Sequence, residues 1–145
     1  MATVTVAAQR IGGIERSKAL HIGLWVVQGL LSLVFLAHGA MLVTQPIAAL
    51  AEMMVWPGAV PAALVRFIGI CEMLGALGLI FPAAMRIRPA LTPLAAAGLT
   101  IILGFAAAFH LSRGEFAALP IALVLSKLAA FVAWGRLAKA PIPPR

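Results

Sequence analysis

The stretch RFIGICEMLGALGLIFP, residues 66–82, has the character of a single hydrophobic helix with a carboxylate, Glu72, near its middle. Its length is close to the roughly 20 apolar residues that cross the hydrocarbon layer of a bilayer. A charged side chain at that depth costs roughly 2.5–3.5 kcal/mol on insertion scales, and by default it marks a site. The stretch therefore predicts a membrane-spanning helix that holds a candidate functional residue.

The composition of the whole chain agrees with a membrane location. Hydrophobic residues make up 63% of the 145 residues and charged residues 10%, whereas soluble domains average about 45–50% apolar and about 25% charged. The net charge of +7 does not indicate a nucleic-acid partner, because no basic stripe alternates with aromatic residues. The single cysteine, Cys71, excludes an internal dithiol pair.

Four apolar runs follow one another, at about residues 20–43, 64–85, 89–111 and 116–135. They are rich in Leu and Ala and lack period-two alternation, so we predict helices. The first run is too long for a cleavable signal peptide, whose apolar core has about 7–15 residues. Short links between the later runs make consecutive helices antiparallel neighbours. We therefore predict an all-α fold, an integral-membrane up-down four-helix bundle at residues 20–137, with an N-terminal segment at 1–19 and a tail at 138–145.

The basic residues predict the orientation of the bundle. Most of them fall on the side that holds both termini, namely Arg10, Arg16, Lys18, Arg86, Arg88, Arg136, Lys139 and Arg145. The opposite side has only Arg66 and Arg113. Since cytoplasmic loops carry the excess of Lys and Arg, both termini are predicted to be cytoplasmic. In the longer link, residues 44–63, we expect a short interfacial helix that starts at Pro46 and ends before Pro57.

Glu72 has small neighbours at helical spacing, Gly69, Gly75 and Ala76, so it is expected to face another helix or a cavity. Lys127 lies in the fourth run at a depth that differs by about 5 Å, which permits an ion pair with Glu72 across the bundle. Three interpretations stay open. The two residues are a packing clasp that fixes helix register, which is favoured, a site that binds or protonates a ligand, or lipid-facing side chains that snorkel.

Further polar residues gather near the outer ends of the runs. His38 and His110 are on different helices and could ligate haem between them, but no metal-binding spacing supports this. No metal site is therefore predicted, and haem b is disfavoured. Arg66 is expected to anchor its helix or to bind an anionic group. The third run also carries a ladder of small residues, expected to pack closely against a neighbouring helix or else to floor a ligand groove: Ala96, Thr100, Gly104 and Ala108.

Several motifs together resemble a known family. RFIGICEMLGALGLIFP is followed by RIRPALTPLAAAGL (residues 86–99), and FLAHGAMLVTQP (35–46), HLSRGEF (110–116) and FVAWGR (131–136) fit the same pattern. The chain resembles the DoxX-like family of small bacterial four-helix membrane proteins over about residues 20–137. One departure is Leu42, where family members often have a lysine, so any role of that lysine does not carry over.

The resemblance implies a multi-pass protein of the bacterial cytoplasmic (inner) membrane. The family is named after a component of quinone-linked sulfur oxidation, and the matching positions here are Arg66, Glu72, His110 and Arg113. Our leading hypothesis is a redox-associated subunit that binds a quinone or similar lipophile within the bundle. In it Glu72 and His110 would be catalytic, and a further set would contact the ligand: Arg66, Lys127, His38 and Arg113.

Two alternatives need no quinone. One is a cofactor-free intramembrane isomerase or hydrolase of an apolar small molecule, and the other is a non-enzymatic assembly protein. The expected partners are membrane lipids, a lipophilic small molecule and a membrane or periplasmic redox protein, with no nucleic acid. A homo-oligomer is left open.

Overall fold

The computed structural model describes the backbone of residues 2–145 and the side chains of residues 18–145. The described elements are helical: α1 Ala2–Thr44, α2 Ile47–Met54, α3 Ala62–Met85, α4 Leu91–Ser112 and α5 Leu119–Trp134. A short 3-10 turn, Trp56–Gly58, lies between α2 and α3, and another, Phe116–Ala118, lies between α4 and α5. A π-helical turn, Gly135–Lys139, extends α5. The side chains of Arg10 and Arg16, which contribute to the predicted orientation, lie outside the described residues.

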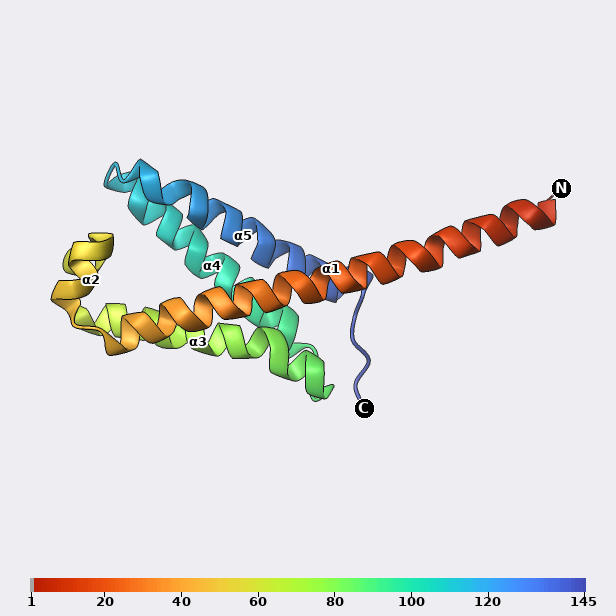
Figure 1. Cartoon of the computed structure of the whole chain (residues 1–145), viewed down its shortest axis with the longest axis horizontal. Coiled ribbons are helices and arrows are strands. Elements are labelled where there is room, and N and C mark those ends of the chain that lie inside the picture. The colour runs from red at the N-terminus through yellow and green to blue at the C-terminus, as the bar shows by residue number, and fades with distance from the viewer. Residues whose placement is uncertain (1) are drawn as a thin grey trace.

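Four helical segments are long and apolar enough to cross a membrane: Lys18–Thr44, Ala62–Met85, Leu91–Ser112 and Phe116–Lys139. Figure 1 shows them as an up-down bundle in which α1 lies beside α3, and α4 beside α5. The C-terminus and the N-terminal part of α1 are at one end, which we call the termini end. The other end, which carries α2, we call the α2 end. The predicted four-helix membrane fold is confirmed.

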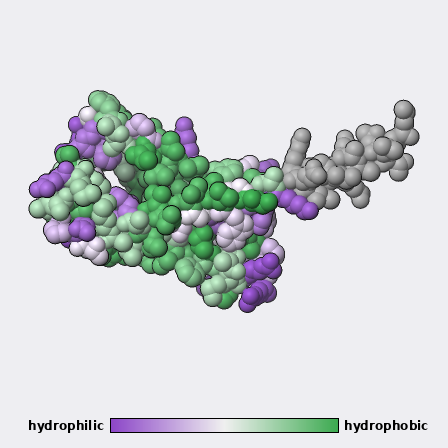
Figure 2. Space-filling model, viewed as in Figure 1, coloured by the Kyte–Doolittle hydropathy of each residue, from purple (hydrophilic) through white to green (hydrophobic). Residues whose placement is uncertain are grey.

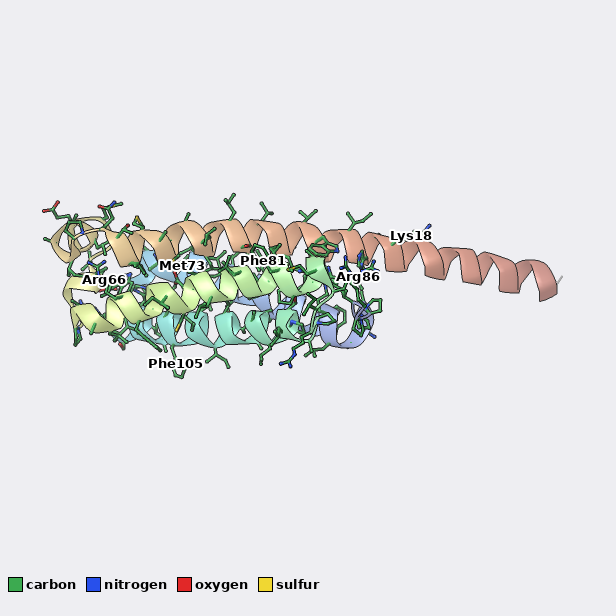
Figure 3. The ribbon with its side chains drawn as sticks, turned by 90° about the horizontal axis from the view of Figure 1, so that it is seen from below. Lys18, Arg66, Met73, Phe81, Arg86 and Phe105 are labelled. Carbon is green, nitrogen blue, oxygen red and sulfur yellow. The ribbon has the colours of Figure 1, made fainter. Side chains whose placement is uncertain are left out.

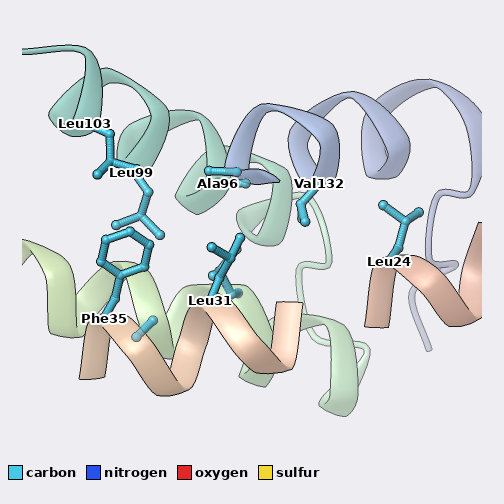
Figure 4. Close-up of a cluster of buried hydrophobic side chains, with 10 residues drawn as sticks. Leu24, Leu31, Phe35, Ala96, Leu99, Leu103 and Val132 are labelled. Carbon is cyan, nitrogen blue, oxygen red and sulfur yellow. The ribbon is translucent and has the colours of Figure 1, made fainter. Parts of the chain in front are cut away.

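The core runs along the centre of this bundle. Figure 4 shows Phe35 and Leu31 of α1 facing Leu99 and Leu103 of α4, with Val132 of α5 nearer the termini end. Outside the core, large apolar side chains such as Phe105, which is 74% exposed, cover the surface of the spans. In Figure 2 apolar residues cover the middle of the molecule and polar residues gather toward its ends. This pattern is that of a protein surrounded by lipid.

Glycines bring the helix backbones together where lipid gives no hydrophobic drive for packing. A Cβ added to Gly39 of α1 would lie 2.6 Å from the carbonyl oxygen of Gly69 in α3. A Cβ on Gly78 would lie 2.7 Å from that of Ala95 in α4. The α1–α3 and α3–α4 interfaces therefore depend on glycine at these positions.

The small-residue ladder predicted in the third span does not form one packing ridge. Ala96 is buried, but Gly104 and Ala108 are exposed, and nothing lies within 4 Å of a Cβ added to Gly104. Each step of four residues turns by about 40° around a helix with 3.6 residues per turn. The ladder therefore leaves the interface after Thr100 and continues on the outer surface of α4.

The short helix predicted in the first link is confirmed as α2. It follows Pro46 and ends at Met54, before Pro57. Its Leu50 is fully buried against Leu42 of α1 and Val65 of α3. This contact fixes α2 on the corner formed by α1 and α3, and Figure 2 shows a hollow between the lobe of α2 and the turn that joins α4 to α5.

Candidate functional site

Glu72 lies inside the bundle, as its small neighbours predict, with 5% of its surface exposed. Its Oε2 is 2.6 Å from Nδ1 of His38, which reaches it from α1. The ion pair between Glu72 and Lys127 that the sequence permitted is not formed, because Lys127 is exposed and α5 lies diagonally across the bundle from α3. Similar depth in two spans was not sufficient, since diagonal helices do not face each other.

The contact between α1 and α3 places His38 beside Glu72. Next to His38, Gly39 packs so closely on α3 that an added Cβ would lie 3.2 Å from the Cβ of Glu72. Leu42, about one turn further along α1, packs equally closely on α3, because a Cβ added to Gly69 would lie 2.8 Å from the Cβ of Leu42. The two backbones are therefore near enough for an imidazole and a carboxylate to meet directly between them.

The His38–Glu72 pair forms a polar layer next to the Phe35 and Leu99 layer of the apolar core, on the side of the α2 end. His38 follows the buried Phe35 by three residues, and Glu72 precedes Gly75, which packs on Leu99, by three residues. Three residues correspond to about 4.5 Å along a helix. His38 and Glu72 therefore lie almost one turn beyond the Phe35 and Leu99 layer, on the side of the α2 end. A third of the His38 side chain, 33%, is exposed there, against 7% of the Glu72 side chain.

This arrangement can carry acid–base chemistry. With Glu72 ionised, its carboxylate accepts the Nδ1–H of His38, and Nε2 of the neutral imidazole is left as a proton acceptor. A carboxylate that orients an imidazole and stabilises its protonated form is a recurring arrangement of general bases. The partial exposure of His38 gives a bound molecule access to the ring.

Arg66, one of the predicted ligand-binding residues, is engaged with the protein itself. Its guanidinium donates a hydrogen bond to the carbonyl oxygen of Leu42. That carbonyl is in the last turn of α1, where such groups lack helical partners and where a cation is favoured. The structure therefore shows Arg66 as an anchor between the end of α1 and the start of α3.

His110 and Arg113 belong to a second cluster, in the turn between α4 and α5. Nδ1 of His110 and Nε of Arg113 each lie 2.7 Å from a carboxylate oxygen of Glu115. These hydrogen bonds, that of Arg113 first, hold the pKa of Glu115 below its ordinary value. The structure brings His110 together with Arg113 as a brace for this turn, and it does not bring either to Glu72.

His38 and His110, the two histidines near the α2 end, contact different carboxylates. Nδ1 of His38 and Nδ1 of His110 are each occupied by a different glutamate. Among the described side chains, no group of three or more His, Cys, Asp or Glu residues could hold a metal ion. The two histidines therefore serve separate clusters.

A third polar cluster, at the termini end, was not predicted as a site. The sequence placed Arg136 only among the cytoplasmic charges, yet it is 3% exposed, and its Nε donates to Oε1 of Gln28 at 2.6 Å. Nδ1 of His21 lies 3.1 Å from Nη1 of Arg136, whose guanidinium also lies over the ring of Trp25. The spacing of positions 21, 25 and 28 on one face of α1 is the sequence signal that could have found this cluster.

Comparison with known proteins agrees with this architecture. No curated protein and no solved structure matches the chain. The sequence model of the DoxX-like family matches residues 26–132, which is well over half of the chain and includes most of the four membrane spans. The chain therefore belongs to the DoxX-like family, as an integral membrane protein with four spans.

Proposed function

We propose that this DoxX-like membrane protein binds a lipophilic small molecule of the quinone class and exchanges a proton with it at the His38–Glu72 pair. The observation that carries the proposal is the 2.6 Å contact between Nδ1 of His38 and Oε2 of Glu72 inside an apolar bundle. Ionisable groups at membrane depth are costly, so their presence favours a function.

The residues of the pair fit a quinone. When bound, a quinone supplies oxygens that gain or lose protons as the ring gains or loses electrons. Nε2 of His38 would accept the proton of a hydroxyl group, and Glu72 would stabilise the resulting imidazolium. The core layer of Phe35 and Leu99 would exclude water from the termini side. Electrons would pass to a separate membrane or periplasmic redox protein, in keeping with a redox-associated subunit.

The remaining predicted site residues receive other roles in this proposal. His38 replaces His110 as the partner of Glu72. His110 and Arg113 hold the turn between α4 and α5 through Glu115, and Arg66 holds the end of α1. Lys127, exposed on α5, would extend toward the lipid headgroups.

The test is the mass spectrum and visible absorbance of whatever co-purifies with the protein in mild detergent. The proposal expects a quinone with the wild type and its loss in Glu72→Gln and His38→Gln. Ser32→Ala is the matched control, because Ser32 also bonds across α1 and α3, to the carbonyl oxygen of Ala76, but belongs to no ionisable pair. Its quinone content should equal that of the wild type.

Two results would favour the other functions. If Glu72→Gln retains the same bound lipophile, or if no lipophile is found and the variant only lowers the folding yield, the pair is a packing clasp of an assembly protein. If the purified protein converts an apolar substrate without any redox cofactor, the isomerase or hydrolase is the better description.

We also propose that the protein lies in a bacterial inner membrane with both termini in the cytoplasm. Both termini belong to the same end of the bundle, which also carries Lys18, Arg86, Arg88 and Lys139. A C-terminal fusion to green fluorescent protein should fluoresce, and a fusion to alkaline phosphatase should be inactive. The reverse pattern would place the termini outside.

A further inference from the structure

At the termini end, far from the His38–Glu72 pair, hydrogen-bond donors outnumber acceptors. Arg136 is buried, with its Nε bonded to Gln28 and its Nη1 within 3.2 Å of the carbonyl oxygen of Ala140. Its Nη2 is buried and has no hydrogen-bond partner among the described residues. An unpaired donor on a buried cation is costly, so an acceptor that is not part of the described chain would stabilise it.

His21 adds to this excess. Nη1 of Arg136 approaches Nδ1 of His21 at 3.1 Å, and Nε1 of Trp25 approaches Nε2 of the same ring, also at 3.1 Å. A neutral imidazole has only one acceptor nitrogen, and a protonated one has none. In at least one of these two contacts, two N–H groups therefore face each other. Nη1 of Arg136 still donates to the carbonyl oxygen of Ala140, so Nη2 is the donor of Arg136 that has no partner among the described residues.

Two cavities that are open to the surface adjoin this cluster, and both are bordered by His21. The first, of about 190 Å³, is also lined by Trp25, Arg86 and the tail residues Ile142 and Pro143. The second, of about 500 Å³, is lined by Lys18 and Lys139. Figure 3 shows Lys18 and Arg86 at the same end of the bundle, with Arg66 at the opposite end.

The charges around these cavities are all of one sign among the described side chains. Lys18, Arg86 and Lys139 line them, and Arg136 is buried between His21 and Gln28. Of the described glutamates, Glu72 and Glu115 are paired elsewhere, and Glu52 lies on α2 at the opposite end. The cluster therefore offers charge and N–H groups to an anion.

The position of the His21–Arg136 cluster at the ends of the membrane spans indicates which anion it binds. Lys18 and Lys139 are the terminal residues of the first and fourth spans, and Arg86 directly follows the second. These ends of the spans are at the level of the lipid phosphates, and basic pockets between helices at this level bind anionic headgroups. From these observations we infer that the His21–Arg136 cluster and its cavities bind the phosphodiester headgroup of an anionic phospholipid. This inference is independent of the proposed quinone site.

The test uses the full chain, reconstituted with equal amounts of phosphatidylglycerol and phosphatidylcholine and then extracted in mild detergent for native mass spectrometry. The variant is Arg86→Gln, which removes a charge that lines the smaller cavity. The control is Arg88→Gln, because Arg88 is also exposed in the same turn and also has a positive φ, yet lines neither cavity. Both substitutions lower the net charge equally and leave the core intact.

Wild type and Arg88→Gln should retain phosphatidylglycerol in preference to phosphatidylcholine. Arg86→Gln should retain about fivefold less of it, the effect of removing one basic residue at a membrane surface. Equal retention of the two lipids by the wild type, or equal losses in the two variants, would overturn the inference. Displacement of the lipid by inorganic phosphate alone would show a site for free phosphate and would also overturn it.

Discussion

At the scale of single residues, Gln28 connects three helices. It is fully buried on α1, donates from Nε2 to the carbonyl oxygen of Leu79 in α3, and accepts from Nε of Arg136 beyond α5, both at 2.6 Å. Both hydrogen bonds are shielded from water, so removing the amide leaves the guanidinium of Arg136 short of a further acceptor. Gln28 therefore stabilises the termini end more than its single polar group suggests.

Replacement of Gln28 by Leu should lower the free energy of unfolding by about 1–3 kcal/mol, the cost of leaving a buried donor unpaired. Ser32→Ala, which removes a neutral hydrogen bond to Ala76, should cost only about 0.6 kcal/mol, the average inside a membrane bundle. Reversible unfolding in mixed micelles measures both values. Equal losses for the two variants would show that the guanidinium does not depend on Gln28.

The stability of the turn between α4 and α5 should depend on pH. Arg113 and His110 hold the pKa of Glu115 below its ordinary value of 4.5. Because the folded pKa is the lower one, the stabilisation by this carboxylate is fully present above pH 4.5 and is lost as the pH falls through the folded pKa. Carbon-13 NMR of the Glu115 carboxyl group should show a titration midpoint below the ordinary value. Arg113→Gln should raise this midpoint, and an unchanged midpoint would contradict the role given to Arg113.

The sequence was sufficient to select Glu72, because a carboxylate among glycines in an apolar run is expected to face the interior of a bundle. The sequence was not sufficient to identify the side chain that contacts Glu72. Depth can be counted along a span, but the choice between His38 and Lys127 depends on which helices are neighbours and on how each is rotated. Arg136 was missed for a related reason, since a basic residue at the end of a span normally lies at the membrane surface.

At the scale of helices, the contact of α1 with α3 controls the candidate site. Gly39 and Gly69 meet with no room for a side chain, and His38 and Glu72 lie directly beside them. Any group inserted there must separate the two helices or shift one along the other. The geometry of the pair is therefore set by glycines that carry no chemistry of their own.

Gly69→Ala should lower the free energy of unfolding by about 1–3 kcal/mol, as overpacking does, because its Cβ would lie 2.8 Å from the carbonyl oxygen of Gly39. Gly104→Ala is the control, since nothing lies within 4 Å of the new methyl group. It should be neutral or stabilise α4 by up to about 1 kcal/mol. If both variants unfold alike in mixed micelles, close α1–α3 packing is not what holds the helices together.

The positions of the helices could be predicted from hydropathy alone, because each membrane span needs a long apolar run. The rotation of each helix about its own axis could not be predicted from hydropathy. Nearly all faces of these spans are apolar, so no hydrophobic stripe distinguishes the core from the lipid side. This is why the ladder from Ala96 to Ala108 predicted an interface that α4 turns away from, whereas nothing in the sequence marked Gly39 and Gly69 as a packing pair.

At the scale of the whole molecule, the two ends of the bundle differ. At the termini end α1, α3 and α5 are joined by Gln28 and Arg136. At the α2 end a hollow lies between α2 and the turn that joins α4 to α5 (Figure 2), and the α1–α3 pair and the α4–α5 pair each have their own histidine–glutamate contact. Under the proposed function, a lipophile would enter from this end and stop at the core layer of Phe35 and Leu99.

The most direct test is the affinity for a short-chain quinol, decyl-ubiquinol, measured anaerobically with the purified protein in mild detergent. Wild type and Arg113→Gln should bind decyl-ubiquinol with the same affinity, because Arg113 belongs to the separate Glu115 cluster. Glu72→Gln should bind it more weakly, because the carboxylate that orients His38 is lost. Equal affinity of wild type and Glu72→Gln would contradict the central claim that the His38–Glu72 pair exchanges a proton with a bound lipophile.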